Sequence, residues 1–180
     1  MRPLQWWPER QLLWIERERS FALWMHSAAT RPWVRRSLRV VSRLSDGWLW
    51  YATMLALPWI DHASGTSVSI RMASVALGNL LIYYIIKRSF ARPRPYRSCP
   101  GIRACMPSLD EFSFPSGHTL HAVSFSLILV SYYPSLHIVV WPFVALVAVS
   151  RVVLGLHYPS DVIVGAVVGA MTAAVSFNLL

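Results

Sequence analysis

The sequence predicts an all-α protein, namely an integral membrane bundle of about five spanning helices preceded by amphipathic interfacial helices. Three observations support this prediction. Of the 180 residues, 55% are hydrophobic and only 14% are charged, which is unusual for a soluble domain. Five apolar stretches each approach the roughly 20 residues that a helix needs to cross a bilayer. Nearly all basic residues lie before or between these stretches.

Residues 1–46 are predicted to form an amphipathic interfacial segment, followed by a transmembrane bundle over residues 47–180. The first segment contains nine arginines interspersed with tryptophans, a mixture typical of helices in the headgroup region. A spanning helix through residues 16–19 would bury four charged side chains, so we expect this segment to stay at the surface. The same charges argue against a cleaved signal peptide.

The five spanning helices are expected at 48–62, 67–87, 117–133, 136–156 and 160–180. The first is short and needs tilt or extension into the interface. In the last, Gly165, Gly169 and Ala173 recur every four residues, which indicates a face for close helix packing inside the protein.

Five spans also predict which loops lie together. The N-terminal segment, the loop 88–116 and the turn near 157–160 fall on one side of the membrane, so the polar chemistry gathers there. The net charge of +9 does not indicate nucleic acid, because the basic residues form no stripe on a polar domain. Membrane lipids and phosphate groups are the expected partners.

The first candidate motif is KRSFARPRP, which contains Lys87 and Arg94. The prolines at 93 and 95 disfavour helix at the residues before them, so Arg94 is expected in an extended segment that folds back toward Lys87. Both cations would then face one anion. Considered alone, the motif is also compatible with an ordinary basic flank at a helix end.

The second motif is PSGH, residues 115–118. Pro115 and Ser116 can start a helix and leave the amides of Gly117 and His118 free to attract an anion. His118 can exchange a proton there. The alternative is a capping turn followed by an interfacial histidine.

The third motif is SRVVLGLHYPSD, with Arg151, His157 and Asp161. The four-residue step from His157 to Asp161 can bring the carboxylate to one imidazole nitrogen and leave the other free as a nucleophile. An arginine facing the bundle interior is costly unless it serves a site.

Together the three motifs, K-x6-RP, PSGH and SR-x5-H-x3-D, resemble the signature of the type 2 phosphatidic acid phosphatase (PAP2) family from Lys87 to Asp161. The resemblance implies a metal-independent lipid phosphate phosphohydrolase that works through a phosphohistidine and needs no cofactor. It implies His157 as nucleophile, Asp161 as its orienting partner and His118 as general acid. The implied phosphate-binding residues are Lys87, Arg94, Ser116, Gly117 and Arg151.

Three other functions are compatible with parts of the pattern. A metal hydrolase could use His118, His121, His157 and Asp161 as ligands, although nearby arginines and a lysine would repel a cation. Vanadate haloperoxidases resemble the same motifs, but they are mostly soluble and larger. A lipid-binding or scramblase-like bundle could keep a phosphate pocket without catalysis.

The resemblance does not fix the lipid or the oligomeric state. Short bacterial members that begin with an amphipathic segment resemble undecaprenyl pyrophosphate phosphatases, whereas others act on phosphatidylglycerol phosphate, phosphatidic acid or lipid A phosphates. The loop also carries Arg88, Arg92, Arg97 and Arg103, enough charge to meet a second phosphate. Undecaprenyl pyrophosphate is therefore the expected substrate.

The expected location is the inner (cytoplasmic) membrane of a bacterium, with several spans. The positive-inside rule would place the active-site face in the cytoplasm. Cys99 and Cys105 share one loop of that face, and Pro100-Gly101 could turn the chain enough to join them in an oxidising compartment. Because related lipid phosphatases work on the outer side, we expect a periplasmic active site with a Cys99–Cys105 disulfide.

Overall fold

The computed structural model describes the backbone of residues 9–179 and the side chains of residues 13–179. The helical elements of this part of the chain are α1 (Glu9–Ser27), η2 (Ala28–Thr30), α2 (Pro32–Leu44), α3 (Trp48–Ile60), α4 (Gly65–Phe90), α5 (Pro95–Ser98), α6 (Gly117–Tyr132), η3 (Pro134–Leu136), α7 (His137–Val153) and α8 (Pro159–Leu179). The described residues form no strand, which confirms the predicted all-α class.

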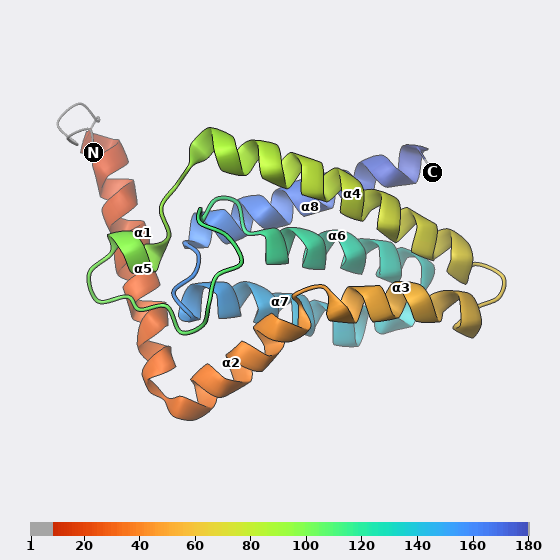
Figure 1. The fold of residues 1–180 in the computed structure, drawn as a ribbon, viewed down its shortest axis with the longest axis horizontal. Helices are drawn as coiled ribbons and strands as arrows, with labels where there is room; N and C mark the ends of the chain where they lie inside the picture. Colours follow the sequence, from red (N-terminus) through yellow and green to blue (C-terminus); the bar gives the residue numbers. More distant parts are fainter. Residues whose placement is uncertain (1–8, 180) are drawn as a thin grey trace.

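Helices α3, α4, α6, α7 and α8 form an elongated bundle, and α1 lies across one end of it (Figure 1). Helix α6 is central, since it contacts α4, α7 and α8. These five helices coincide with the five predicted spans to within a few residues. Hydropathy therefore located the bundle correctly.

Not all five helices are long enough to cross a membrane by themselves. Within the described residues, three helical stretches have the necessary length and hydropathy: Gly65–Phe90, Pro134–Val153 and Pro159–Leu179. Helix α3 has 13 residues and α6 has 16, so three of the five predicted spans meet these criteria and the two shorter helices fall below the length. The chain changes direction at Gly47, which has a φ of 113°, and this turn limits the length of α3. Prolines shortly before and after α6 limit the length of that helix.

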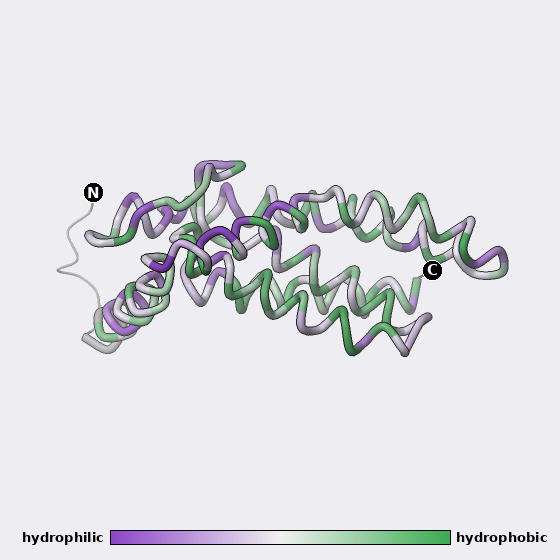
Figure 2. Tube along the Cα trace, turned by 90° about the horizontal axis from the view of Figure 1, so that it is seen from below, coloured by the Kyte–Doolittle hydropathy of each residue, from purple (hydrophilic) through white to green (hydrophobic). Residues whose placement is uncertain are grey.

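The N-terminal arm consists of α1, η2, α2 and the turn 45–47 that follows α2. Helix α2 is strongly amphipathic and contacts α7, whereas α1 contacts both α7 and α8. Hydrophilic stretches concentrate toward the arm's end of the molecule, and the shafts of the bundle are mainly hydrophobic (Figure 2). Helix α2 thus has the amphipathic character expected for this segment, and the position of the segment at the membrane surface stays a prediction; its first eight residues lie outside the described part.

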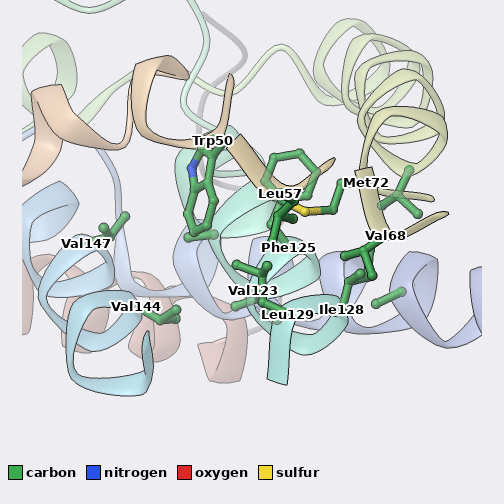
Figure 3. Close-up of a cluster of buried hydrophobic side chains, with 13 residues drawn as sticks. Trp50, Leu57, Val68, Met72, Val123, Phe125, Ile128, Leu129, Val144 and Val147 are labelled. Carbon is green, nitrogen blue, oxygen red and sulfur yellow. The ribbon is translucent and has the colours of Figure 1, made fainter. Parts of the chain in front are cut away.

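The largest hydrophobic cluster joins α3 and α4 to α6 and α7 (Figure 3). Its Trp50 ring lies 5.3 Å from Phe125 and 6.2 Å from Phe143, measured between ring centroids. Leu57, Met72 and other buried side chains fill the cluster further along the bundle. Aromatic pairs at such distances contribute beyond their buried area, so Trp50 fixes α3 against α6.

The small-residue face of α8 packs inside the protein, as predicted. A Cβ atom on Gly165 would lie 2.5 Å from the carbonyl oxygen of Ser116, and one on Gly169 would lie 2.3 Å from that of Leu120. Ala173 is fully buried in the main cluster. The glycines therefore let α8 approach the start of α6, where the PSGH motif stands.

The loops sort to the two ends of the bundle as expected. The loop after α4 and the turn between α7 and α8 lie at the same end as α1, and the α3–α4 turn and the C-terminus lie at the other end (Figure 1). All three candidate motifs are therefore at one end.

The predicted Cys99–Cys105 disulfide is wrong, because both cysteines are free thiols. The chain does turn at Gly101, which has a φ of 93°, but the two side chains pack into different clusters. Cys99 packs with Ile102 and Tyr158, while the Cys105 amide donates to the carbonyl of Leu154 at 3.0 Å.

Candidate active site

The three motifs meet around a cavity of about 600 Å³ at the arm's end of the bundle. Five of the eight predicted site residues line it: Arg94, Gly117, His118, Arg151 and His157. The other three stand directly behind this lining. Lys87 reaches the lining residue Asp110, and the Ser116 amide donates to the carbonyl of Asp161 at 2.9 Å.

The first motif folds back as predicted. Helix α4 ends at Ala91, whose left-handed φ of 44° turns the chain, and Arg94 then lies in an extended segment. Arg94 is 1% exposed and donates to the Leu156 carbonyl at 2.7 Å. Lys87 and Arg94 both face one anion, the carboxylate of Asp110, at 2.7 and 2.8 Å.

The second motif opens α6. Ser116 is buried, and its hydroxyl lies 3.0 Å from that of Thr119. Gly117 is the first helical residue, and a Cβ there would come within 2.8 Å of the Tyr83 ring. A glycine is therefore required for α6 to begin beside α4, with its first amides directed at the cavity end.

His157 lies in the turn between α7 and α8 and is 2% exposed. Arg94 donates to its Nε2 at 3.2 Å, so Nε2 is the unprotonated nitrogen and the proton belongs on Nδ1. Burial, together with the charges of Arg151 and Arg94, holds the pKa of His157 well below its usual value. The ring is therefore neutral, with a nucleophilic Nε2 facing the cations.

Asp161 lies close to His157 but is not bonded to it. Its Oδ2 is 3.7 Å from Nδ1 of His157, beyond hydrogen-bonding distance. That oxygen accepts the Tyr158 amide at 2.7 Å, and Oδ1 accepts Arg92 at 2.8 Å. Glu18 of α1 holds the other side of Arg92 at 2.7 Å. His157 and Asp161 are thus adjacent as predicted, and the carboxylate lies between three groups: the His157 ring, Arg92 and the Tyr158 amide.

Arg151 projects from the end of α7 into the site and is 1% exposed. Its Nη1 donates to the hydroxyl of Ser42 in α2, and its Nε has no partner among the described residues. A buried guanidinium with an unused donor at a cavity wall can bind an anionic oxygen.

Four further residues of the site were missed by the sequence analysis. Asp110 accepts from Lys87, Arg94 and the Tyr83 hydroxyl. Hydrogen bonds and cations outweigh the burial that would raise the pKa of Asp110, and they lower it. In the sequence, Asp110 could have been noticed as one of two adjacent acidic residues in an otherwise basic loop. Asp46 bonds to His118, and Ser42 and Glu18 come from the same arm; no pattern in the sequence indicates a contact of these three residues with the site.

The additional loop arginines do not line the cavity. Arg92 is held by Glu18 and Asp161, Arg97 pairs with Glu111 at 3.1 Å, and Arg88 lies over the Tyr84 ring. The expectation that these arginines meet a second phosphate in the site is therefore not supported. In the described part of the chain, no three His, Cys, Asp or Glu side chains are grouped to hold a metal ion.

Comparison with known proteins gives a consistent family match. The profile of the PAP2 superfamily matches residues 68–180. The chain is 31% identical over 157 residues to the decaprenylphosphoryl-5-phosphoribose phosphatase of Mycobacterium tuberculosis, covering 81% of this chain and 80% of the relative. It is 28% identical over 134 residues to undecaprenyl-diphosphatase BcrC of Bacillus subtilis, covering 72% and 65%.

Solved structures share the fold. The crystal structure of Aquifex aeolicus LpxE aligns with a TM-score of 0.78 at 22% identity, covering 88% of this chain and 93% of that one. The phosphatidylglycerolphosphate phosphatase of Bacillus subtilis aligns with a TM-score of 0.70 at 23% identity, covering 89% and 84%.

Proposed function

The chain belongs to the PAP2 superfamily, and from this premise we propose that it removes the terminal phosphate of a polyprenyl-linked lipid through a phosphohistidine intermediate. The observation that carries the proposal is the cavity itself. Its lining combines His157, His118, Arg94 and Arg151 with apolar side chains of α3 and α4, including Met54. The charged lining is complementary to a phosphate group, and the apolar lining is complementary to the start of a lipid chain.

In the proposed reaction, Nε2 of His157 attacks phosphorus and the bond to the leaving oxygen breaks. His118 donates a proton to that oxygen, and Asp161 stabilises the positive charge that develops on the His157 ring. A water molecule then attacks the phosphohistidine while His118 takes its proton, which releases phosphate and restores both histidines. No metal takes part in this scheme.

The transferred phosphoryl group needs positive charge around its oxygens. Lys87, Arg94 and Arg151 supply it, together with the Gly117 amide at the start of α6. Because Asp110 holds Lys87 and Arg94 in the structure, the substrate phosphate takes over these donors from the carboxylate. Ser116 acts from behind the lining, where it ties the α6 start to α8.

Undecaprenyl pyrophosphate is the first substrate to test, and the likeness to undecaprenyl-diphosphatase BcrC supports it. The second candidate is decaprenylphosphoryl-5-phosphoribose. It is favoured by the 31% identical relative that acts on this lipid, and by a cavity whose lining cations suit one terminal phosphate. Both candidates combine a polyprenyl chain with a terminal phosphate.

The experiment is phosphate release by the purified protein in detergent, with these two lipids, phosphatidylglycerol phosphate and phosphatidic acid as substrates. We expect a polyprenyl lipid to have the highest kcat/KM. A rate about tenfold higher for either glycerophospholipid would overturn the choice of lipid. Absence of release from all four would favour a non-catalytic lipid-binding or scramblase-like bundle.

The same assay tests metal independence. Activity is expected to survive prolonged treatment with EDTA. Loss of activity on chelation, with recovery on adding Zn²⁺ or Mg²⁺, would show that the phosphohistidine scheme is wrong.

We also propose that the protein lies in a bacterial inner membrane with its arm in the headgroup region and its site facing the periplasm. Exposed indoles at Trp14, Trp24 and Trp33 support the interfacial arm. The periplasmic orientation rests on the family resemblance. Pro100→Cys in a Cys99→Ser, Cys105→Ser background tests it, because this exposed position should react with an impermeant maleimide in intact spheroplasts. Reaction only after lysis would place the site in the cytoplasm.

A further inference from the structure

The carboxylate of Asp46 contacts the ring of His118, and we propose that Asp46 is the positioning residue that holds His118 ready to protonate the leaving oxygen. The inference rests on the proposed function, since it requires His118 to act as the general acid. It assigns a part in the reaction to the arm, which lies outside the three motifs and outside the matched residues 68–180.

The contact joins Oδ1 of Asp46 to Nε2 of His118, and both residues line the cavity. Among the described residues it is the only hydrogen bond of the His118 ring. The side chains of His118 and Asp46 are 9% and 23% exposed, so the pair is largely shielded from water. Charge interactions are stronger in such surroundings than at an open surface.

The turn that carries Asp46 is fixed by its own residues. The Asp46 amide donates to the Arg43 carbonyl at 3.1 Å, and Ser42, four residues earlier, accepts from Arg151 in the site. Gly47 has a φ of 113°, which side chains other than glycine rarely adopt. The direction of the Asp46 side chain is therefore set by the backbone.

A packed aromatic pair holds the same two segments together. Trp50 follows Asp46 by four residues, Phe125 follows His118 by seven, and their rings are 5.3 Å apart. His118 and Phe125 lie on one side of α6, since they are seven residues apart in a helix, and Trp50 lies in the first turn of α3, directly after the Asp46 turn. The polar contact therefore attaches the Asp46 turn to α6, and the aromatic contact attaches the adjoining start of α3 to the same helix.

This attachment explains how a proton can be delivered in one direction. Nε2–H of a protonated His118 donates to Asp46, so Nδ1–H is the proton that passes to the leaving oxygen as the P–O bond breaks. His118 is left neutral, with Nε2–H still bonded to Asp46. In the second step Nδ1 takes a proton from the attacking water, and the cycle closes.

The charges around the site make such a partner necessary. Lys87, Arg94 and Arg151 gather where the phosphate binds, and these cations disfavour a protonated imidazole beside them. A carboxylate in direct contact opposes this effect. The alternative is a purely structural role, in which Asp46 stabilises the first turn of α6 through the helix dipole.

A double-mutant cycle separates the two roles. Asp46→Asn should lower kcat about 10- to 100-fold with little change in KM, because a poorly positioned acid loses much of its contribution. In a His118→Ala background the same change should cost less than about twofold. Asp61→Asn is the matched control, because Asp61 bonds to Tyr133 at 2.9 Å at the opposite end of the bundle; it should leave kcat unchanged.

The leaving group provides a second readout. The loss in Asp46→Asn should be larger for a lipid phosphomonoester, which expels an alcohol, than for undecaprenyl pyrophosphate, which expels a phosphate that needs less protonation. If Asp46→Asn does not fold, judged by its melting temperature, Asp46→Glu replaces it and should show the same leaving-group dependence in weaker form. Equal losses with and without His118, or for both leaving groups, would overturn the inference. An inactive wild-type protein would instead refute the proposed function.

Discussion

The two histidine–carboxylate pairs of the site differ in how they are built. His157 and Asp161 are four residues apart within one motif, yet Nδ1 of His157 and Oδ2 of Asp161 are 3.7 Å apart, and the carboxylate also binds Tyr158 and Arg92. His118 and Asp46 are 72 residues apart, yet they are in direct contact. The two residues that are close in sequence therefore form the more distant pair, and the two that are brought together by packing of distant segments are in direct contact.

The difference suggests a division of tasks. A nucleophile that becomes positively charged needs a carboxylate nearby but not a fixed proton path, and a shared Asp161 meets that need. A general acid must present one proton in one direction, which a dedicated carboxylate secures. Under this proposal the arm takes part in the reaction as well as in contact with the membrane.

The largest effect is expected at His157, the proposed nucleophile. His157→Ala should lower kcat by about four orders of magnitude or more for every substrate, since the covalent step is lost. Phosphate release and acid-labile phosphohistidine should both disappear. His137→Ala, a change at an exposed histidine near the opposite end, serves as the control. A leaving-group-dependent loss at His157 would reverse the two assigned roles.

Replacing the shared carboxylate should affect both rate and stability. Asp161→Asn is expected to lower kcat about 100-fold and to cost about 3 kcal/mol of unfolding free energy, because the ion pair of the fully buried Asp161 carboxylate with Arg92 is broken and Arg92 keeps only Glu18 as an acidic partner. The melting temperature should therefore fall more than in Asp46→Asn, whose carboxylate is partly exposed. Equal stability of the two variants would contradict the distinction between a shared and a dedicated carboxylate.

Hydropathy and the local spacing of residues were sufficient to predict much of this architecture. The apolar stretches located the five bundle helices, the prolines around Arg94 predicted the fold-back toward Lys87, and the glycines of α8 predicted its packing face. All eight predicted site residues came together at one end, because loops between successive helices must alternate between the two ends.

Contacts between distant segments could not be read from the sequence. Asp46 meets His118 because the turn before α3 lies beside the start of α6, where Trp50 also packs on Phe125, and hydropathy does not encode that placement. The Cys99–Cys105 pairing failed for a related reason: the turn at Gly101 was correct, but the chain beyond it is held by Leu154.

Contacts of the arm with the nucleophile pair should matter less. Glu18 reaches Asp161 only through Arg92 and also accepts the Ser160 amide at 2.8 Å. A partly exposed ion pair is worth about 1 kcal/mol, so Glu18→Gln should lower kcat about fivefold. Glu16→Gln, at an exposed position on the same helix, should have no effect. An unchanged kcat in Glu18→Gln would limit the catalytic part of the arm to α2 and the Asp46 turn.

The smallest effect is expected at Asp110, which belongs to neither pair. Its carboxylate competes with phosphate for Lys87 and Arg94, so Asp110→Asn should lower KM and the inhibition constant of inorganic phosphate about threefold, at nearly constant kcat. Glu111→Gln is the matched control, because Glu111 is adjacent but bonds to the exposed Arg97. Steady-state kinetics with phosphate as inhibitor measures both constants. If the inhibition constant of phosphate rises in Asp110→Asn, Asp110 orients the two cations for the substrate and does not compete with it.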